Sequence, residues 1–233
     1  MKIGIMQPYF FPYLGYWQLM NRVDRYVVLD DVAFIKKGWI NRNTIKSNGN
    51  PLKINISIEN ISQNRLINEH YLVSDNKIKI KLIKQIEQSY SHAPYFDIVM
   101  PMIKNIINYD ENNVALYLFN QIKVIAKYLE MDTEFYLSSQ INKDNTLKGQ
   151  DRIIELCKKL NADTYINAIG GKELYDKESF KKENIELCFL KMNDVIYNQG
   201  NGEFIPCLSI IDILMNKSVK QIQTLLDEYT LVE

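Results

Sequence analysis

The sequence predicts an α/β fold, with a Rossmann-like, mostly parallel sheet, helices on both faces, a β-hairpin and a helical insertion. Short apolar runs typical of strands alternate with stretches whose apolar residues recur at helical spacing, which is the pattern of a covered parallel sheet. The first run, residues 2–6, is apolar throughout apart from Lys2, as expected of a strand buried on both faces. Asn48-Gly49, followed by alternating apolar residues, indicates a hairpin.

The N-terminal quarter predicts strand, loop, helix and strand in that order. Residues 7–17 form a loop that holds two prolines, a glycine and several aromatic residues, and an amphipathic stretch leads on to a strand at 25–31. Residues 43–58 predict the hairpin, because Leu52, Ile54 and Ile56 alternate on one face beyond its turn. Residues 60–76 show no periodicity and predict a loop.

The rest of the chain predicts a helical middle followed by further strands. Pro101 is expected to kink or split the second of the middle helices. The predicted helices cover residues 77–90, 95–108, 112–130, 150–160, 208–215 and 217–229, with a short charged helix or turn at 177–183. The predicted strands cover residues 134–138, 163–167 and 185–191, and a polar loop covers 142–149. We expect one domain, 1–233, with its core in 1–60 and 133–200, a helical subdomain at about 77–130 and C-terminal helices at 208–229.

Composition excludes several classes of protein. Lysine plus arginine (28) equals aspartate plus glutamate (28), so no overall basic field argues for nucleic-acid binding. The three cysteines lack the spacing of a zinc site or disulfide framework, and Cys207 is expected to be a buried thiol although a nucleophile is an alternative. The N-terminal apolar run is too short for a signal peptide and no later run suits a membrane span, so a cytoplasmic protein without membrane contact is expected.

Polar or glycine-rich loops follow each predicted parallel strand. These loops are residues 7–16, 30–46, 138–148 and 167–171, and in a parallel sheet they converge on one rim, where ligands of open α/β sheets bind. The aromatic loop at 7–17 is accordingly either a hydrophobic plug or the wall of a pocket. The adjacent Gly170 and Gly171 would allow close backbone approach to a phosphate, and a simple turn is the alternative.

Charged side chains gather in residues 30–46. Lys36, Lys37, Arg42 and Lys46 surround Trp39, a combination suited to a phosphate with a stacked base or sugar, while a solvated hairpin flank is the alternative. Asn41 adds an amide that can bind hydroxyls or ring nitrogens. Asp30 or Asp31 could hold magnesium or a ribose diol, or could cap the next turn.

Five ordered motifs resemble the WbqC-like family of bacterial proteins. They are Gln7-Pro8-Tyr9-Phe10-Phe11-Pro12-Tyr13-Leu14-Gly15-Tyr16, Trp39-Ile40-Asn41-Arg42-Asn43-Thr44-Ile45-Lys46, Ala93-Pro94-Tyr95-Phe96, Gly170-Gly171 and Ser209-Ile210-Ile211-Asp212-Ile213-Leu214. This resemblance implies a role in O-antigen or other surface-polysaccharide biosynthesis, in which an amino acid such as glycine is attached to an amino sugar.

The first loop also has a distant likeness to nucleotidylyltransferases and pantothenate synthetases. In those enzymes a His/Thr-x-Gly-His element opens the helix after the first strand and stabilises the transferring phosphoryl group. Here Tyr13 and Tyr16 stand in place of the polar catalytic residues. A cation from Lys36, Lys37 or Arg42 would then have to supply the charge, or else the pocket has lost adenylyl transfer.

The resulting hypothesis is an enzyme that forms an amide on the amine of a nucleotide-linked amino sugar. His92, Asp30 and Asp31 are the candidate catalytic residues, with no metal held by the protein alone. The candidate ligand-binding residues are Gln7, Tyr9, Tyr13, Tyr16, Lys36, Lys37, Trp39, Asn41, Arg42, Lys46, Gly170 and Gly171. The cofactor is left open, with ATP and magnesium as the candidate, and an activated amino acid or acyl donor is the expected second substrate. A homodimer is compatible with the sequence. A nucleotidylyl- or glycosyltransferase-like enzyme and a noncatalytic nucleotide-sugar-binding protein are the alternatives.

Overall fold

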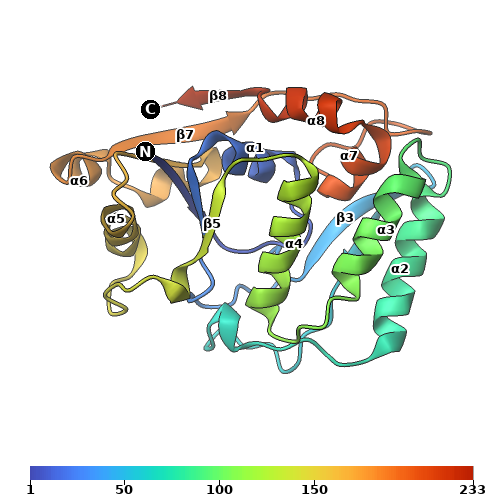
Figure 1. Cartoon of the computed structure of the whole chain (residues 1–233), viewed down its shortest axis with the longest axis horizontal. Helices are drawn as coiled ribbons and strands as arrows, with labels where there is room; N and C mark the ends of the chain where they lie inside the picture. The colour runs from blue at the N-terminus through green and yellow to red at the C-terminus, as the bar shows by residue number, and fades with distance from the viewer. Residues whose placement is uncertain (233) are drawn as a thin grey trace.

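The computed structural model describes residues 1–232 and shows a six-stranded sheet beside a separate two-stranded hairpin (Figure 1). The strand order is β5-β2-β1-β6-β7-β8, and every neighbouring pair is parallel except β7 with β8. The strands of the sheet are β1 (Lys2–Met6), β2 (Arg25–Val28), β5 (Glu134–Leu137), β6 (Thr164–Ala168), β7 (Glu186–Met192) and β8 (Tyr229–Val232). The predicted α/β class with a mostly parallel sheet is therefore confirmed.

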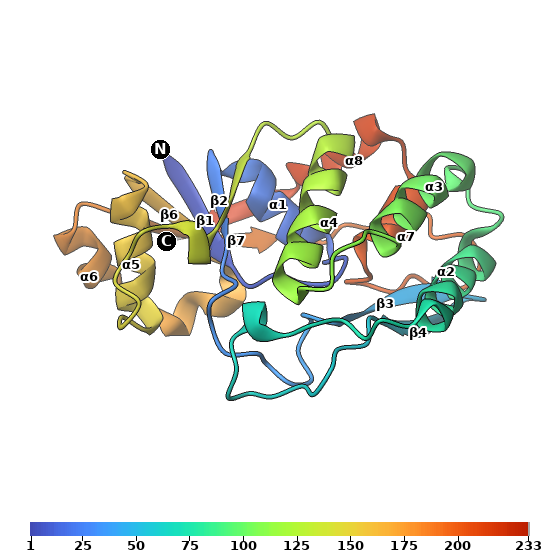
Figure 2. The same ribbon diagram turned by 60° about the horizontal axis from the view of Figure 1, so that its bottom comes forward.

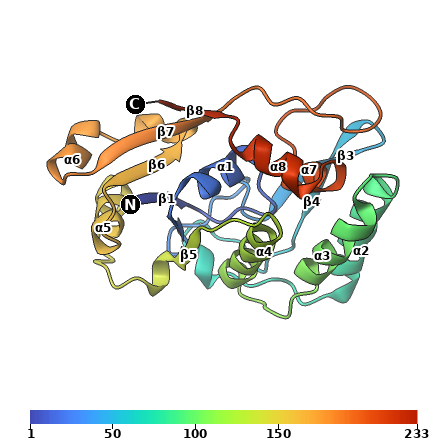
Figure 3. The same ribbon diagram turned by 45° about the horizontal axis from the view of Figure 1, so that its top comes forward.

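Helices cover both faces of the sheet. They are α1 (Leu14–Arg22), α2 (Asn76–Tyr90), α3 (Phe96–Ile107), α4 (Val114–Tyr128), α5 (Gly149–Lys159), α6 (Lys177–Lys182), α7 (Ile210–Asn216) and α8 (Val219–Leu226). Figure 3 shows α5 and α6 on one side of the sheet and α1 and α8 on the other. Neighbouring strand residues face opposite cores, as Tyr165 packs with α5 and α6 while Ile166 packs on the α1 side. Within residues 1–232, each helix is too short or too polar to cross a lipid bilayer.

The larger core joins the sheet to the helical middle and to the C-terminal helices. It contains Trp17 of α1, Ile103 of α3, Ile122 of α4 and Leu214 of α7, all of them fully or almost fully buried. Because apolar residues of all these elements share one cluster, the packing supports the proposal that the chain is one domain with α2 to α4 as a helical subdomain.

The hairpin consists of β3 (Arg42–Ser47) and β4 (Asn50–Asn55), so it begins one residue before the predicted range of 43–58 and ends three residues before its end. Asn48 and Gly49 both have positive φ angles, which gives the two-residue turn its shape. Figure 2 shows the hairpin beside α2, and the two elements are in contact. One face of the ribbon is buried there, with Ile45 and Ile54 inaccessible to solvent.

Two local details differ from the prediction. Helix α3 is not split at Pro101, because the missing N–H removes a single hydrogen bond in the second turn and the ring lies on the exposed side. The last helix ends at Leu226 rather than 229, and Tyr229–Val232 forms β8. This edge strand is stabilised by pairing with β7, a distant contact that local periodicity does not reveal.

The chain leaves β1 and β6 toward opposite faces of the sheet. These strands are neighbours, but β1 leads to α1 whereas β6 leads through the short helix η3 (Ile169–Leu174) to α6. Such a topological switch point, at the carboxyl ends of the strands, is where open α/β sheets bind ligands. The loops after β1 and β6 are therefore the first place to look for a site.

Candidate functional site

The aromatic loop between β1 and α1 is fixed by side chains from distant parts of the chain. Asn43 of β3 donates to the carbonyls of Phe10 (3.0 Å) and Phe11 (2.7 Å), and Gln121 of α4 accepts from the Phe11 amide (3.1 Å). Ser209, the N-cap of α7, also donates to the Phe11 carbonyl (2.8 Å). Phe11 has φ 42°, a left-handed conformation that these bonds stabilise.

The loop is partly a plug and partly a wall. Phe10 and Phe11 are fully buried, and so are Tyr16 and Trp17 of α1, which donate to the carbonyls of Gln7 and Pro12 respectively. Gln7, Tyr9 and Tyr13 are only half-buried, and within residues 1–232 their side chains form no hydrogen bond. These three side chains are available to a ligand, while the buried rings hold the backbone in place.

Gly15 explains how Tyr13 is positioned. A Cβ atom at position 15 would lie 2.7 Å from the Tyr13 ring, so only glycine allows this ring to lie across the first turn of α1. Burial raises the pKa of Tyr13, as do the nearby Cys207 and Tyr9. The Tyr13 phenol is therefore protonated at neutral pH and can donate a hydrogen bond.

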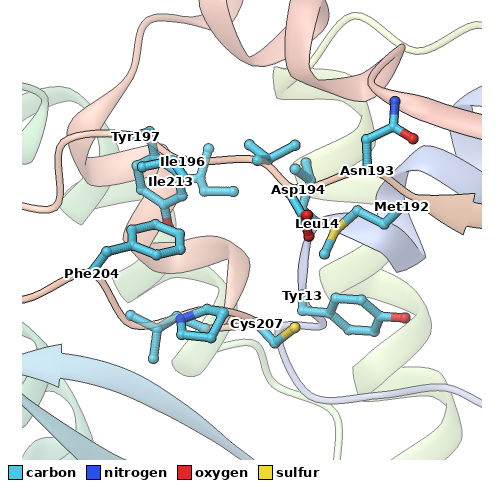
Figure 4. Close-up of a pocket in the computed structure, with 13 residues that line it drawn as sticks. Tyr13, Leu14, Met192, Asn193, Asp194, Ile196, Tyr197, Phe204, Cys207 and Ile213 are labelled. Atoms are coloured by element: carbon cyan, nitrogen blue, oxygen red, sulfur yellow. The ribbon is translucent and has the colours of Figure 1, made fainter.

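A cavity of about 320 Å³, which we call the β7 pocket, opens where β7 ends and α1 begins (Figure 4). Its lining includes Tyr13, Met192, Asp194, Tyr197, Phe204 and Cys207. Figure 4 shows the rings of Tyr197 and Phe204 on one side of the opening and Tyr13 with Met192 on the other. Asp194 is exposed, makes no hydrogen bond or ion pair within residues 1–232, and is the single charged residue in the lining.

Cys207 lies in the lining of this pocket rather than in the core. The prediction of a buried thiol was wrong, since Cys207 is exposed whereas Cys157 and Cys188 are buried. Its side chain points toward Tyr13 in Figure 4. The loop of residues 193–209 that carries it returns from the end of β7 to the N-cap of α7, a connection that no local sequence pattern specifies.

A buried carboxylate, Asp212 of α7, lies behind the β7 pocket. It accepts hydrogen bonds from Tyr197 (2.7 Å) and from Tyr90 of α2 (2.8 Å). Burial raises the pKa of Asp212, although the two phenols and the charge of Lys46 act in the opposite direction. This carboxylate was missed as a functional candidate, and the one available signal was a charged residue within the apolar run of residues 208–215.

Asp30 and Asp31 lie past the end of β2 and bind the loop after β5. Asp30 accepts from the Ser139 hydroxyl (2.6 Å) and amide (2.9 Å) and from Ser138 (3.1 Å). Asp31 accepts from Ser138 and pairs with Lys143 (2.6 Å). These bonds confirm that the two strand-end loops converge, because a parallel sheet aligns the carboxyl ends of its strands.

Both carboxylates are fully engaged by the chain. Asn68 donates to Asp30 (3.3 Å), and Arg152 lies 3.6 Å from Asp31. Burial disfavours the charged form of Asp31, but hydrogen bonds from Lys143 and Ser138 and the charge of Arg152 outweigh it and lower the pKa of Asp31. These aspartates do not fit a magnesium ion, since each oxygen already has a partner, and no group of three metal-ligating side chains occurs within residues 1–232.

The basic segment divides into exposed and engaged residues. Lys36, Lys37 and Trp39 are exposed, and Trp39 keeps 52% of its surface accessible. Arg42 folds back to donate to the carbonyls of Gly38 (3.0 Å) and Lys37, and Asn41 donates to that of Ile56 (3.3 Å). Their predicted ligand roles stay predictions.

The remaining candidate residues lie in two other places. Lys46 is buried and donates to the Glu203 carbonyl (2.8 Å), and it lines a second, polar groove together with His92. Gly170 and Gly171 lie in η3, after β6 at the switch point. Of the predicted residues, Tyr13 alone lines the β7 pocket, which brings in Asp194, Tyr197 and Cys207 instead.

Comparison with known proteins gives the family of the chain. The WbqC-like protein family matches residues 7–224. The chain belongs to the WbqC-like family. It is also 25% identical over 219 residues to the uncharacterized protein Rv1507c of Mycobacterium tuberculosis, which covers 92% of this chain and 93% of that protein. No solved structure matches. Family membership agrees with a biosynthetic enzyme and specifies neither a substrate nor a reaction.

Proposed function

We propose that the protein is a biosynthetic transferase of surface-polysaccharide (O-antigen) assembly. It attaches an amino acid, such as glycine, to the amino group of a nucleotide-linked amino sugar. The β7 pocket supports this proposal because its lining contains the Asp194 carboxylate and no cation. A pocket with this charge suits the ammonium group of an amino sugar better than a phosphate.

The walls of the β7 pocket suit the remainder of such a ligand. Tyr13, Tyr197 and Phe204 present aromatic rings, on which the apolar face of a sugar can pack. The cavity, at about 320 Å³, lies at the lower end of the range for small-molecule sites. It therefore suits the amino sugar itself, with the nucleotide outside.

Amide formation requires a free amine, an activated acyl group and stabilisation of an oxyanion. In the proposed reaction Asp194 binds the ammonium group and accepts its proton, so that the amine can attack the acyl carbon. A carbon–nitrogen bond forms, the activating group leaves with the bonding electron pair, and the second proton of the attacking nitrogen passes to that leaving group or to water. The Tyr13 phenol, kept protonated by its raised pKa, donates to the oxyanion.

The alternative of nucleotidylyl transfer is less well supported at this site. Phosphoryl transfer uses cationic side chains or metal ions to balance the charge of the transferring group, and the pocket lining has no lysine, arginine or histidine. His92, the predicted general base, lies in the lining of the polar groove instead.

The test is an amide-forming assay followed by mass spectrometry. Purified protein is incubated with UDP-linked amino sugars and glycine, supplied either with ATP and magnesium or as a glycyl thioester. We expect an amide product, and Asp194→Asn should reduce its rate about 100-fold or more, because a positioned base contributes at least that factor. Glu203→Gln is the matched control, since Glu203 is an exposed carboxylate of the same loop outside the pocket. Equal rates for the two variants would contradict the role of Asp194, and pyrophosphate release that does not depend on glycine would favour nucleotidylyl transfer.

A further inference from the structure

The second cavity differs from the β7 pocket in volume, charge and lining. This hairpin groove, about 520 Å³, lies between the hairpin tip, the end of α2 with the turn after it, residues 198–201 and the start of α8. Asparagine and glutamine are the most frequent residues of its lining, which includes Lys46, Lys217 and His92 but no aspartate or glutamate. We propose that the groove binds an anionic saccharide, that is, a sugar that carries a phosphate or a carboxylate.

The groove is preformed by backbone contact. Gly49 at the hairpin tip lies close to Gly202. A Cβ atom on residue 202 would be 3.2 Å from the Cα of Gly49, and Gly202 has φ 83°. Glycine at position 202 lets the tip and the 198–202 loop meet. Gln199 stiffens this loop by bonding both the amide and the carbonyl of Ile205. A ligand would therefore find the two walls already in place.

Lys46 supplies the argument for an anion. Its residue surface is 4% exposed, and its ammonium group donates to the Glu203 carbonyl but forms no ion pair within residues 1–232. Buried ammonium groups are normally paired with a carboxylate, and they have three donors to satisfy. The nearby Asp212 gives only partial compensation, since it is directed at Tyr90 and Tyr197 and burial raises its pKa. An anionic group in the groove would complete the partners of Lys46.

The amide side chains supply the argument for a saccharide. Asn48, Gln88 and Asn201 line the groove and make no side-chain hydrogen bond within residues 1–232, and the same is true of His92 and Lys217. An amide offers a donor and an acceptor together, which is what a sugar hydroxyl requires. The three amides therefore suit a ligand with several hydroxyls. Lys217 and His92 suit the one negative group of that ligand.

The test is calorimetric titration with glucose 1-phosphate, glucuronate, glucose and inorganic phosphate. Glucose 1-phosphate and glucuronate should bind more tightly than glucose, and the tighter of the two identifies the acidic group. Lys217→Ala should weaken the binding of that probe about tenfold, the usual effect of a charge-assisted hydrogen bond. Lys220→Ala is the matched control, because Lys220 lies three positions further on, in α8, where it is exposed and outside the groove.

The two parts of the proposal fail separately. Glucose binding as tightly as the charged sugars, or Lys217→Ala behaving like Lys220→Ala, would overturn the anion site. Inorganic phosphate binding as tightly as glucose 1-phosphate, with no loss in Gln88→Ala, would overturn the saccharide site. Lys217 and Gln88 are partly or well exposed, so these variants test the groove without disturbing the core.

Discussion

The two ends of the sheet's carboxyl rim differ in how their polar groups are satisfied. After β2 and β5, Asp30 and Asp31 are surrounded by donors from the chain itself. At the end of β7, Asp194 and the half-buried Tyr13 have no such partners and line a cavity. Charge at a strand end is therefore insufficient to indicate a site. The informative feature is a polar group that has no partner from the chain and lines a cavity.

The largest expected effect is at the end of the rim after β2 and β5, where Lys143→Met removes one partner of a buried ion pair. Unfolding free energy should fall by about 3–5 kcal/mol, because Asp31 would keep its charge with only the more distant Arg152 to compensate it. Urea denaturation measures the change. Lys36→Met is the control, since Lys36 is exposed and should change stability by less than about 0.5 kcal/mol. If both variants lost a similarly small amount of unfolding free energy, the network of Asp31 with Lys143 and Arg152 would contribute little to stability.

The next effect is the pH dependence of the same network. The pKa of Asp31 is lower in the folded chain than in the unfolded one, so the network stabilises the fold above the unfolded value of about 3.9. That stability is lost as the pH falls through the folded value. Asp31→Asn should therefore be less stable than the wild type at neutral pH, and the difference should shrink below about pH 4. Denaturation midpoints that differ equally at pH 7 and pH 3 would contradict the assigned shift.

The smallest effect concerns the β7 pocket, where the reactivity of Cys207 reports whether a ligand is bound. A thiol reagent should modify this exposed cysteine before the buried Cys157 and Cys188. Glucosamine should slow the modification severalfold, whereas glucose should have little effect, because only the amine pairs with Asp194. Mass mapping of the labelled peptide follows the reaction, with Cys207→Ser as the control for site assignment. If glucose slowed the modification of Cys207 as much as glucosamine does, the amine of glucosamine would not pair with Asp194.

The sequence alone determined the fold class and most of the elements. The first strand, the hairpin turn at Asn48-Gly49 and the middle helices follow from local apolar spacing and turn residues, which act over a few positions. The convergence of the loops after β2 and β5 also followed, since parallel strands align their ends. The strand β8 was not predictable in this way, because it exists through pairing with β7.

Only the tertiary structure decided which polar residues are engaged and which remain open. The sequence presents Asp31 and Asp194 alike, as carboxylates near strand ends. The first lies against Lys143, more than a hundred positions later in the chain, and the second borders a cavity closed by α1 and the loop of residues 193–209. Whether a polar side chain finds a hydrogen-bond or ion-pair partner depends on residues that are distant in sequence. The local sequence pattern does not identify those residues.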